Sequence, residues 1–457
     1  MISLHVAFEE RMKKLLGDGY DSFITAVTNE KPTKGLFVNK KIENSSVCSF
    51  CTTKMPFFDG GYYFDVDGIG NLPIHHAGGI YIQDPSAMAT IASVKGQNFS
   101  NVLDMCASPG GKSLGAYLSM KEGGVLVSNE FVPSRCKTIV GNIERFGIKN
   151  AIVTNYDMTQ SSPLCDIYPE FFDLVICDAP CSGEGMFRKY PEEAISEWSV
   201  DNVMLCAKRQ KELLDNACNF VCEGGLLLYS TCTFSLDENE MQIDDFLSRH
   251  PEFELNPVSE EVRKVTADGY IFDGCKHESI KFTRRFYPHI SKGEGQFIAL
   301  LRKTQGVADS GMDKYKSPLS KPSDIEMKFL SDFIKKSVDG FDLSKVYKYN
   351  ENLIYIDFDV KIPSKKVFSC GVKLGEVIKS RFEPHHQFFN CFGKDFKNVI
   401  DLHEGDESIA KYLHGEVIEA DIDNGWCAVL YEGLVLGGGK AVDGMVKNHY
   451  PKGLRTV

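Results

Sequence analysis

Five short apolar runs alternate with helix-length segments in the middle of the chain, and this alternation restricts the fold more than any other feature. Segments with helical spacing follow the runs, at residues 112–121, 133–146, 191–222 and 237–249. Strand-length runs separated by helices are typical of βαβ units. The pattern therefore predicts a doubly wound, Rossmann-like α/β sheet with mostly parallel strands. The five runs are Asn101–Cys106, Gly124–Glu130, Ala151–Asp157, Phe172–Pro180 and Gly225–Thr233.

The sequence on either side of these runs predicts further units. Two more apolar runs, Lys281–Tyr287 and Gln296–Leu301, are joined by Pro288–Gly295, which suits a hairpin. We therefore expect an antiparallel pair at one edge of the sheet. The segment Val6–Ala26 has helical spacing and precedes a lysine-rich stretch, which favours an N-terminal RNA-binding extension. Residues 304–323 are polar and rich in Ser, Pro and Lys, which is typical of a linker.

The charge balance and the cysteines exclude several classes of protein. With 51 Lys and Arg against 63 Asp and Glu, the net charge is −12. The chain therefore does not coat nucleic acid through bulk charge, although a local basic face is compatible with it. No apolar run approaches the roughly 18 residues that span a bilayer, and no signal-peptide core is evident. We expect a cytoplasmic protein whose 15 cysteines are reduced thiols.

No metal site is predicted. Cys48 and Cys51 form a lone CxxC pair, whereas a zinc ribbon needs a second pair at a suitable spacing. His75 and His76 are adjacent in the sequence, so on a strand their side chains point to opposite faces. We expect the two histidines to pack over the active site instead.

A glycine-containing turn after the first strand marks a ligand site. The segment Asp104–Ser113 follows that strand and opens a helix, whose N-terminus offers unpaired N–H groups. The dinucleotide fingerprint GxGxxG is absent. A P-loop also fits poorly, because Cys106 occupies the place of its leading glycine and Pro109 lacks an N–H donor. The turn is therefore a poor cradle for phosphate.

Carboxylates at the next two strand ends suit a nucleoside. Glu130 ends the second strand, roughly 20 residues past the turn, where an acidic side chain binds the hydroxyls of a ribose. Asp157 ends the third strand, where a carboxylate accepts from an adenine amino group. Either residue alone is equally consistent with an ordinary surface carboxylate. In series with the turn, they predict a site for adenosine without phosphates, which S-adenosyl-L-methionine fits.

Two cysteines and an aspartate follow at the next strand ends. Asp178 and Cys181 close the fourth strand and Cys232 closes the fifth, so both thiols should face the cofactor crevice. A thiolate that adds to C6 of cytosine makes C5 nucleophilic toward a methylsulfonium, and a carboxylic acid at N3 supports the addition. The base must be flipped out or single-stranded. The alternative is that these cysteines are small buried hydrophobes. We expect that of Cys106, Cys136, Cys165, Cys177, Cys206, Cys218 and Cys222.

Five segments of the chain form a recognisable set of motifs. They are Asp104–Ser113, Cys177–Gly185, Ser230–Thr233, His75–Met88 and Arg285–Phe297. The set resembles the motifs of the Nol/Nop/Sun family of RNA cytosine-C5 methyltransferases. The C-terminal segments Gly438–Lys440 and Lys447–Arg455 are similar to the bacterial RsmF-like branch. That branch modifies the 16S RNA of the small ribosomal subunit and carries a PUA-like C-terminal domain.

The resemblance implies a role for each motif residue. Cys232 is the implied nucleophile, Cys181 would assist release of the product, and Asp178 would lie against the cytosine and the methyl donor. One departure is Ala107-Ser108-Pro109, where many relatives have Ala-Ala-Pro or Ala-Pro-Pro, and the change is small. The implied cofactor pocket comprises Cys106, Ala107, Ser108, Pro109, Gly110, Gly111, Lys112, Glu130, Arg135, Asp157 and Asp178.

Two basic clusters near the C-terminus are candidates for RNA binding. The first is interleaved with Phe368 and Phe382, and such a mixture suits a face that tracks the RNA backbone while aromatic rings stack on bases. The alternative is a set of ordinary solvated lysines. The candidates are Lys365, Lys366, Lys373, Lys379 and Arg381 in the first cluster and Lys447 and Lys452 in the second.

We therefore expect an S-adenosyl-L-methionine-dependent methyltransferase of cytosine C5 in ribosomal RNA, free or in the small subunit, acting as a monomer. Alternatives are a transfer RNA methyltransferase, a non-catalytic ribosome-assembly factor and a nucleotide hydrolase. The absence of the leading glycine of a P-loop argues against the hydrolase. The predicted units are the N-terminal α/β extension (1–60), the catalytic domain (61–303), a linker (304–325), a small α+β domain (326–390) and a PUA-like RNA-binding domain (391–457).

Overall fold

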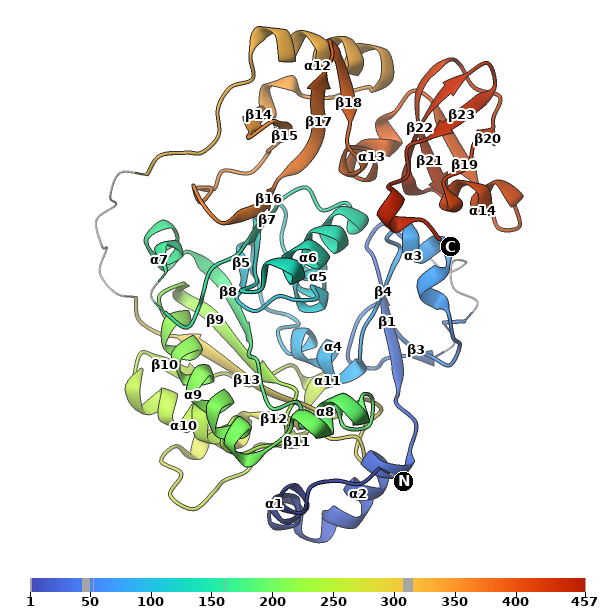
Figure 1. The fold of residues 1–457 in the computed structure, drawn as a ribbon. Coiled ribbons are helices and arrows are strands. Elements are labelled where there is room, and N and C mark those ends of the chain that lie inside the picture. The colour runs from blue at the N-terminus through green and yellow to red at the C-terminus, as the bar shows by residue number, and fades with distance from the viewer. Residues whose placement is uncertain (1, 43–49, 52, 161, 307–314, 457) are drawn as a thin grey trace.

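The computed structural model describes residues 2–42, 50–51, 53–160, 162–306 and 315–456. Its central sheet contains five parallel strands in the order β9-β8-β5-β6-β7 (Figure 1). Their apolar composition reflects burial on both faces of the sheet. The predicted doubly wound α/β sheet is confirmed. The strands are β5 (Val102–Asp104), β6 (Leu126–Asn129), β7 (Ala151–Thr154), β8 (Phe172–Asp178) and β9 (Val221–Thr231).

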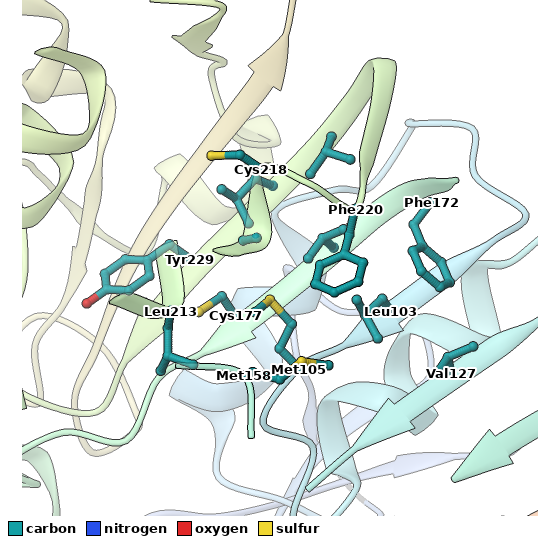
Figure 2. Close-up of a cluster of buried hydrophobic side chains, with 14 of the residues drawn as sticks. Leu103, Met105, Val127, Met158, Phe172, Cys177, Leu213, Cys218, Phe220 and Tyr229 are labelled. Atoms are coloured by element: carbon teal, nitrogen blue, oxygen red, sulfur yellow. The ribbon is translucent and has the colours of Figure 1, made fainter. Parts of the chain in front are cut away.

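Helices cover both faces of this sheet and enclose two cores. On one face, Val102 and Leu126 pack with residues of α4 (Pro85–Ala92), α5 (Gly111–Ser119), α6 (Pro133–Phe146) and α11 (Glu260–Arg263). On the other, Leu103 and Cys177 cluster with Leu213 of α9 (Figure 2). The helices of that face are α7 (Pro163–Ile167), α9 (Val200–Ala217) and α10 (Glu240–Arg249).

The segment expected to be one helix at 191–222 is two helices. The first, α8 (Pro191–Glu197), ends before Trp198, and α9 begins after Ser199. The Ser199 side chain accepts from the backbone N–H of Asn202, which caps α9. Residues 218–220 then leave the helix, and β9 begins at Val221.

Antiparallel strands flank the parallel sheet at both edges. At one edge β13 pairs with β9, and β12 pairs with β13, so the predicted hairpin is confirmed. At the other edge β16 pairs with β7, which the sequence did not indicate. There the Asn155 N–H donates to the Lys366 carbonyl at 2.9 Å, and the Tyr156 hydroxyl donates to the Lys365 carbonyl at 2.8 Å. The flanking strands are β10 (Phe253–Leu255), β11 (Ala267–Asp268), β12 (Arg284–Phe286), β13 (Gln296–Lys303) and β16 (Val367–Cys370).

The N-terminal part consists of two helices and a small sheet. Phe8 of α1 and Phe23 of α2 pack against Phe187, Trp198 and Phe234 of the central unit. The sheet, in the order β2-β3-β1-β4, continues past residue 60, so it crosses the first boundary of the predicted division into domains, which stays a prediction. The elements are α1 (Val6–Leu16), α2 (Tyr20–Asn29), β1 (Lys34–Val38), β2 (Thr53–Lys54), β3 (Gly61–Phe64), α3 (Pro73–His76) and β4 (Ile80–Ile82).

The adjacent histidines differ from the expectation. His75 and His76 end the short helix α3, which Pro73 starts, rather than lying on a strand. Nδ1 of His76 lies 2.8 Å from the Tyr450 hydroxyl, so this helix packs against the C-terminal unit. The expectation that they pack over the active site does not follow from these contacts.

Two small sheets make up the C-terminal part. The first is antiparallel, in the order β14-β15-β17-β18, with α12 packed on it and begun by a Ser323–Glu326 capping box. The second, in the order β19-β21-β22-β23-β20, is mixed because β19 and β21 run parallel. The elements are α12 (Asp324–Ser337), β14 (Val346–Tyr349), β15 (Asn352–Tyr355), β17 (Val372–Ile378), β18 (Arg381–Pro384), α13 (His386–Phe392), β19 (Val399–Leu402), α14 (Glu407–His414), β20 (Ile418–Glu419), β21 (Gly425–Tyr431), β22 (Leu434–Val442) and β23 (Met445–Asn448).

Candidate active site

The glycine turn and the next two strand ends lie together at one edge of the sheet. Gly110 caps α5 with φ at +112°, a left-handed conformation that favours glycine. The Asn129 side-chain amide donates to the carbonyls of Met105 at 3.1 Å and Tyr156 at 3.0 Å. This amide ties the ends of β5, β6 and β7 together. The predicted cofactor residues of the three strand ends are therefore held at one edge of the sheet.

Three of the predicted cofactor side chains beyond the turn, Glu130, Arg135 and Asp157, have limited mutual contact. One oxygen of Glu130 accepts from the Val132 N–H at 2.8 Å, and the other lies 3.8 Å from Nε of Arg135. Arg135 also donates to the Ser108 hydroxyl at 3.2 Å, which joins it to the turn. Asp157 accepts from the N–H and hydroxyl of Thr159, at 3.0 and 2.7 Å.

A buried carboxyl lies beneath the turn. Asp104 is completely buried, accepts from the Ser113 hydroxyl at 2.7 Å, and its Oδ1 has no hydrogen-bond partner among the described residues. Burial raises the pKa of Asp104 to about 7. An unpartnered acceptor and an adjacent row of carboxylates fit the hydroxyl and amino groups of a nucleoside, and they do not fit phosphates. The residues present therefore fit S-adenosylmethionine.

The two predicted thiols meet at the ends of β8 and β9. These strands are parallel neighbours with Asp178 opposite Ser230, which places the loops that follow them side by side. As a result, Sγ of Cys181 lies 3.2 Å from Sγ of Cys232. Contact with Cys232 and burial raise the pKa of the Cys181 thiol well above its usual range. The Cys181 thiol therefore keeps its proton at neutral pH.

Asp178 lies in the same site, held by three donors. Lys112 donates to it at 2.7 Å, Ser230 at 2.6 Å and Gln296 at 3.3 Å. Burial acts to lower the pKa of Lys112, but Asp178, with Cys232 and Asp104, outweighs burial and leaves that pKa raised. The structure thus brings together the turn lysine, the aspartate and the two cysteines. Sequence reasoning missed Ser230 and Gln296 as partners of Asp178, although both lie on motif segments.

The predicted RNA-binding residues are spread over the C-terminal part. Lys365 and Lys366 are exposed beside the sheet edge, with Nζ of Lys366 5.6 Å from the centre of the Tyr156 ring. Arg381 forms an ion pair with Glu383. Of the remaining candidates, Lys373 is half-buried, and Lys379, Lys447 and Lys452 are exposed.

The interpretation of Phe382 as a base-stacking ring is wrong. Its side chain is 5% exposed and packs in the core with Phe333 and Phe388. A buried ring cannot stack on a base. Phe368 is 39% exposed and stays available.

One group of possible metal ligands occurs among the described residues. It consists of Cys218, His250 and Glu252. Arg249 lies 3.3 Å from Nε2 of that histidine, and the Lys303 ammonium donates to the Cys218 carbonyl, so cations already surround the group. The expectation of no metal stays a prediction. Cys48 of the CxxC pair lies outside the described residues.

Comparison with known proteins gives matches along almost the whole chain. The chain is 31% identical to ribosomal RNA small subunit methyltransferase F of Vibrio cholerae, over 99% of this chain and 98% of that protein. The chain belongs to the RsmB/F family. Residues 91–302 match the family described as 16S rRNA methyltransferase RsmB/F, residues 4–85 the N-terminal domain of RsmF, and residues 397–456 the RsmF PUA domain.

Other relatives agree with this assignment. The same methyltransferase of Vibrio vulnificus is 29% identical over 99% of this chain and 98% of its own. A methyltransferase homologue from Pyrococcus horikoshii, solved by crystallography, is 26% identical, with a TM-score of 0.55 over 65% of this chain and 94% of that one. NSun6 from Pyrococcus horikoshii, determined with SFG, shares the fold at 20% identity, with a TM-score of 0.54 over 66% and 98%.

Membership of the RsmB/F family confirms the predicted reaction class. The protein is an S-adenosylmethionine-dependent cytosine-C5 methyltransferase of ribosomal RNA with a C-terminal PUA domain. Across the parts of the chain that the structure describes, no helix is both long and apolar enough to traverse a membrane.

Proposed function

We propose that this enzyme methylates cytosine in 16S RNA of the small ribosomal subunit through a transient bond between Cys232 and C6 of the base. The observation that carries the proposal is the 3.2 Å separation of the Cys181 and Cys232 sulfurs, next to an aspartate fixed by Lys112. Two thiols and a carboxylate at one edge of the sheet supply a nucleophile, a second acid–base group and a hydrogen-bonding partner for the base.

The residues act in a defined order in this mechanism. The Cys232 thiolate forms a bond to C6, and the Asp178 carboxyl, placed by Lys112, assists by hydrogen bonding at N3 of the ring. S-adenosylmethionine, when bound, supplies an electrophilic methyl group to C5. A base then takes the C5 proton, the C5–C6 double bond reforms, and the electron pair of the C6–S bond leaves with Cys232. Cys181, adjacent to that sulfur, assists this elimination.

One copy of the chain holds a complete site. The cofactor turn, Asp178 and both cysteines come from a single polypeptide, so we propose that the protein acts as a monomer. Ribosomal RNA as substrate favours the cytoplasm as its place of action. The RNA of the small subunit is favoured over transfer RNA by the description of the matched family.

We also propose that the basic residues of the C-terminal part bind the RNA backbone. Lys365 and Lys366 are exposed at the edge of the central sheet. The support is weaker for Arg381, whose guanidinium is paired with Glu383, and for half-buried Lys373. The exposed candidates on the remaining elements are Lys379, Lys447 and Lys452.

Two cysteine variants test the mechanism. Cys232→Ala should abolish transfer of tritiated methyl groups to 16S RNA, since the attacking sulfur is gone. Cys181→Ala should accumulate an RNA–protein adduct that survives denaturing electrophoresis. Cys222→Ala, at a half-buried cysteine elsewhere, is the control and should behave as wild type. Full activity of Cys232→Ala would remove the covalent mechanism.

A further inference from the structure

Two adjacent buried residues each hold one of the loops that carry the active-site cysteines. Glu238 and Asn239 lie just before α10, and neither is exposed to solvent. We infer that this pair is a positioning clamp that sets Sγ of Cys181 against Sγ of Cys232. The inference rests on the covalent mechanism proposed above, and neither clamp residue is required to touch the substrate.

Glu238 and Gln210 anchor both peptide neighbours of Cys181. The Glu238 carboxylate accepts from the Ser182 N–H at 2.9 Å and from the Ser182 hydroxyl at 2.5 Å. Nε2 of Gln210, itself fully buried, donates to that carboxylate at 2.8 Å and to the Pro180 carbonyl at 3.0 Å. The backbone before and after Cys181 is therefore fixed from the side of α9 and α10.

Asn239 does the same for Cys232. Its Nδ2 donates to the Thr233 carbonyl at 2.9 Å, and its Oδ1 accepts from the Thr231 hydroxyl at 2.6 Å. These two threonines flank Cys232 in the sequence. In addition, the Gly185 N–H donates to the Cys232 carbonyl at 2.9 Å. The nucleophile's loop thus has its own anchor, separate from that of Cys181.

A direct contact couples the two loops. The hydroxyls of Ser182 and Thr233 lie 2.9 Å apart, and the Tyr229 hydroxyl donates to the Glu238 carbonyl at 2.7 Å. Although this contact joins the loops, each anchor bonds the residues that flank only one cysteine, so loosening it should displace that sulfur more than the other. Loss of the Glu238 anchor should therefore impair release of the product, and loss of the Asn239 anchor should impair attack on the base.

Two isosteric substitutions separate these effects. Glu238→Gln removes the charge from the acceptor of the Ser182 N–H and turns an NH₂ group toward the Ser182 hydroxyl, so both anchoring bonds weaken. Asn239→Asp puts an oxygen against the Thr233 carbonyl. With 16S RNA and tritiated S-adenosylmethionine, Glu238→Gln should accumulate the denaturant-resistant adduct and slow steady-state turnover about tenfold or more, with single-turnover methyl transfer near wild type. Asn239→Asp should slow single-turnover transfer about tenfold or more without extra adduct. Displacements near 1 Å cost up to about 10²-fold in rate.

Controls away from the two loops account for charge and folding. Asp245→Asn on α10 and Gln160→Glu, at an exposed position, make the same exchanges of carboxylate and amide and should leave adduct and rates unchanged. Gln210→Met keeps Glu238 and should reproduce the Glu238→Gln pattern in a milder form, which guards against a misfolded first variant. Thermal unfolding and cofactor calorimetry of each variant establish that it is folded.

The outcomes distinguish failure of the clamp from failure of the covalent mechanism on which it rests. If Cys181→Ala traps the adduct and Glu238→Gln does not, the clamp is overturned and the covalent mechanism stands. If Cys181→Ala traps no adduct, the role of Cys181 in product release is overturned and the clamp with it, whereas the covalent mechanism falls only if Cys232→Ala keeps full activity. Equal slowing of both clamp variants with no change in adduct would assign the two residues to folding alone, which also overturns the clamp.

Discussion

The position of the Asp178 side chain depends on the residues that donate hydrogen bonds to it. The Lys112 side chain is 10% exposed and the Asp178 side chain 28%, so their ion pair is partly screened by water. Removing one member of a buried pair leaves an uncompensated charge, which costs several kcal/mol when no water reaches it. The Ser230 and Gln296 donors soften that cost for the aspartate. The interaction energy between Lys112 and Asp178 should therefore be large enough for a double-mutant cycle to measure.

Lys112→Met and Asp178→Asn should each lower the free energy of unfolding by about 1–3 kcal/mol, and the double variant should lose less than their sum. Urea denaturation of the four proteins gives the coupling energy. The exposed pair Lys34–Asp67, whose nitrogen and oxygen are 2.6 Å apart, is the control and should couple more weakly. A coupling for Lys112–Asp178 no larger than the control's would contradict this prediction.

Glu238 should make stability depend on pH. Burial raises its pKa from 4.5 to about 7, against the hydrogen bonds from Ser182 and Gln210. The folded protein then keeps a proton that the unfolded chain releases, so this stabilisation is complete below about pH 4.5 and is lost as the pH rises through about 7. Between about pH 5 and 8, wild type should lose roughly 2–3 kcal/mol more stability than Glu238→Gln. The urea midpoints of unfolding of both proteins, measured over that pH range, test this prediction. If stability changes with pH equally in the two proteins, the prediction is wrong.

At the scale of elements, the sequence indicated the strands that build the site. Apolar runs and their order are local signals, and parallel neighbours end at one edge, so the meeting of Cys181 and Cys232 followed from β8 and β9 alone. The strand β16 carries no such signal. It is four residues long and pairs with β7, about 200 residues earlier in the chain. Only the folded structure shows that Lys366 lies at the sheet edge.

The junction of β16 with β7 depends on a glycine. Gly371 has φ at +59°, its N–H donates to the Ala151 carbonyl at 2.9 Å, and an added Cβ would lie 2.4 Å from the Tyr355 carbonyl oxygen. Gly371→Val should therefore cost at least about 2 kcal/mol and speed hydrogen exchange in β7. Gly340 also has a positive φ, +66°, but a Cβ added there would have no atom within 4 Å. Gly340→Val therefore measures the cost of the backbone strain without a steric clash. An equal loss in the two variants would show that the close approach to Tyr355 is unimportant.

At the scale of the molecule, the units are joined by elements that the sequence marked only as local structure. Helix α13 contacts α6 of the central unit and both C-terminal sheets, through β17 and β22 (Figure 1). Composition and motifs predicted a PUA-like end and a methyltransferase sheet, because each has its own local pattern. They did not predict how these units pack together, because that depends on side chains distant in the sequence, such as Tyr450 against His76.

The net charge of −12 makes RNA binding a local property of this molecule. RNA is repelled by the body as a whole, so affinity must come from a few lysines that displace counterions from phosphates. If Lys365 and Lys366 are such residues, their double alanine variant should weaken binding to a 16S RNA fragment. The slope of log K against log salt should also fall by about 1 for each phosphate that is no longer neutralised. Fluorescence anisotropy across a salt series measures both quantities.

Two exposed lysines of α12 supply a matched control for this experiment. Lys335 and Lys336 are also adjacent and exposed, in the last turn of that helix. Their double alanine variant changes the net charge by the same amount, so a bulk electrostatic effect would weaken RNA binding equally in both proteins. A salt slope that falls only for Lys365 and Lys366 would place the backbone contacts at the β16 edge. Equal slopes would instead mean that these lysines are ordinary solvated side chains and that the RNA-binding face lies elsewhere.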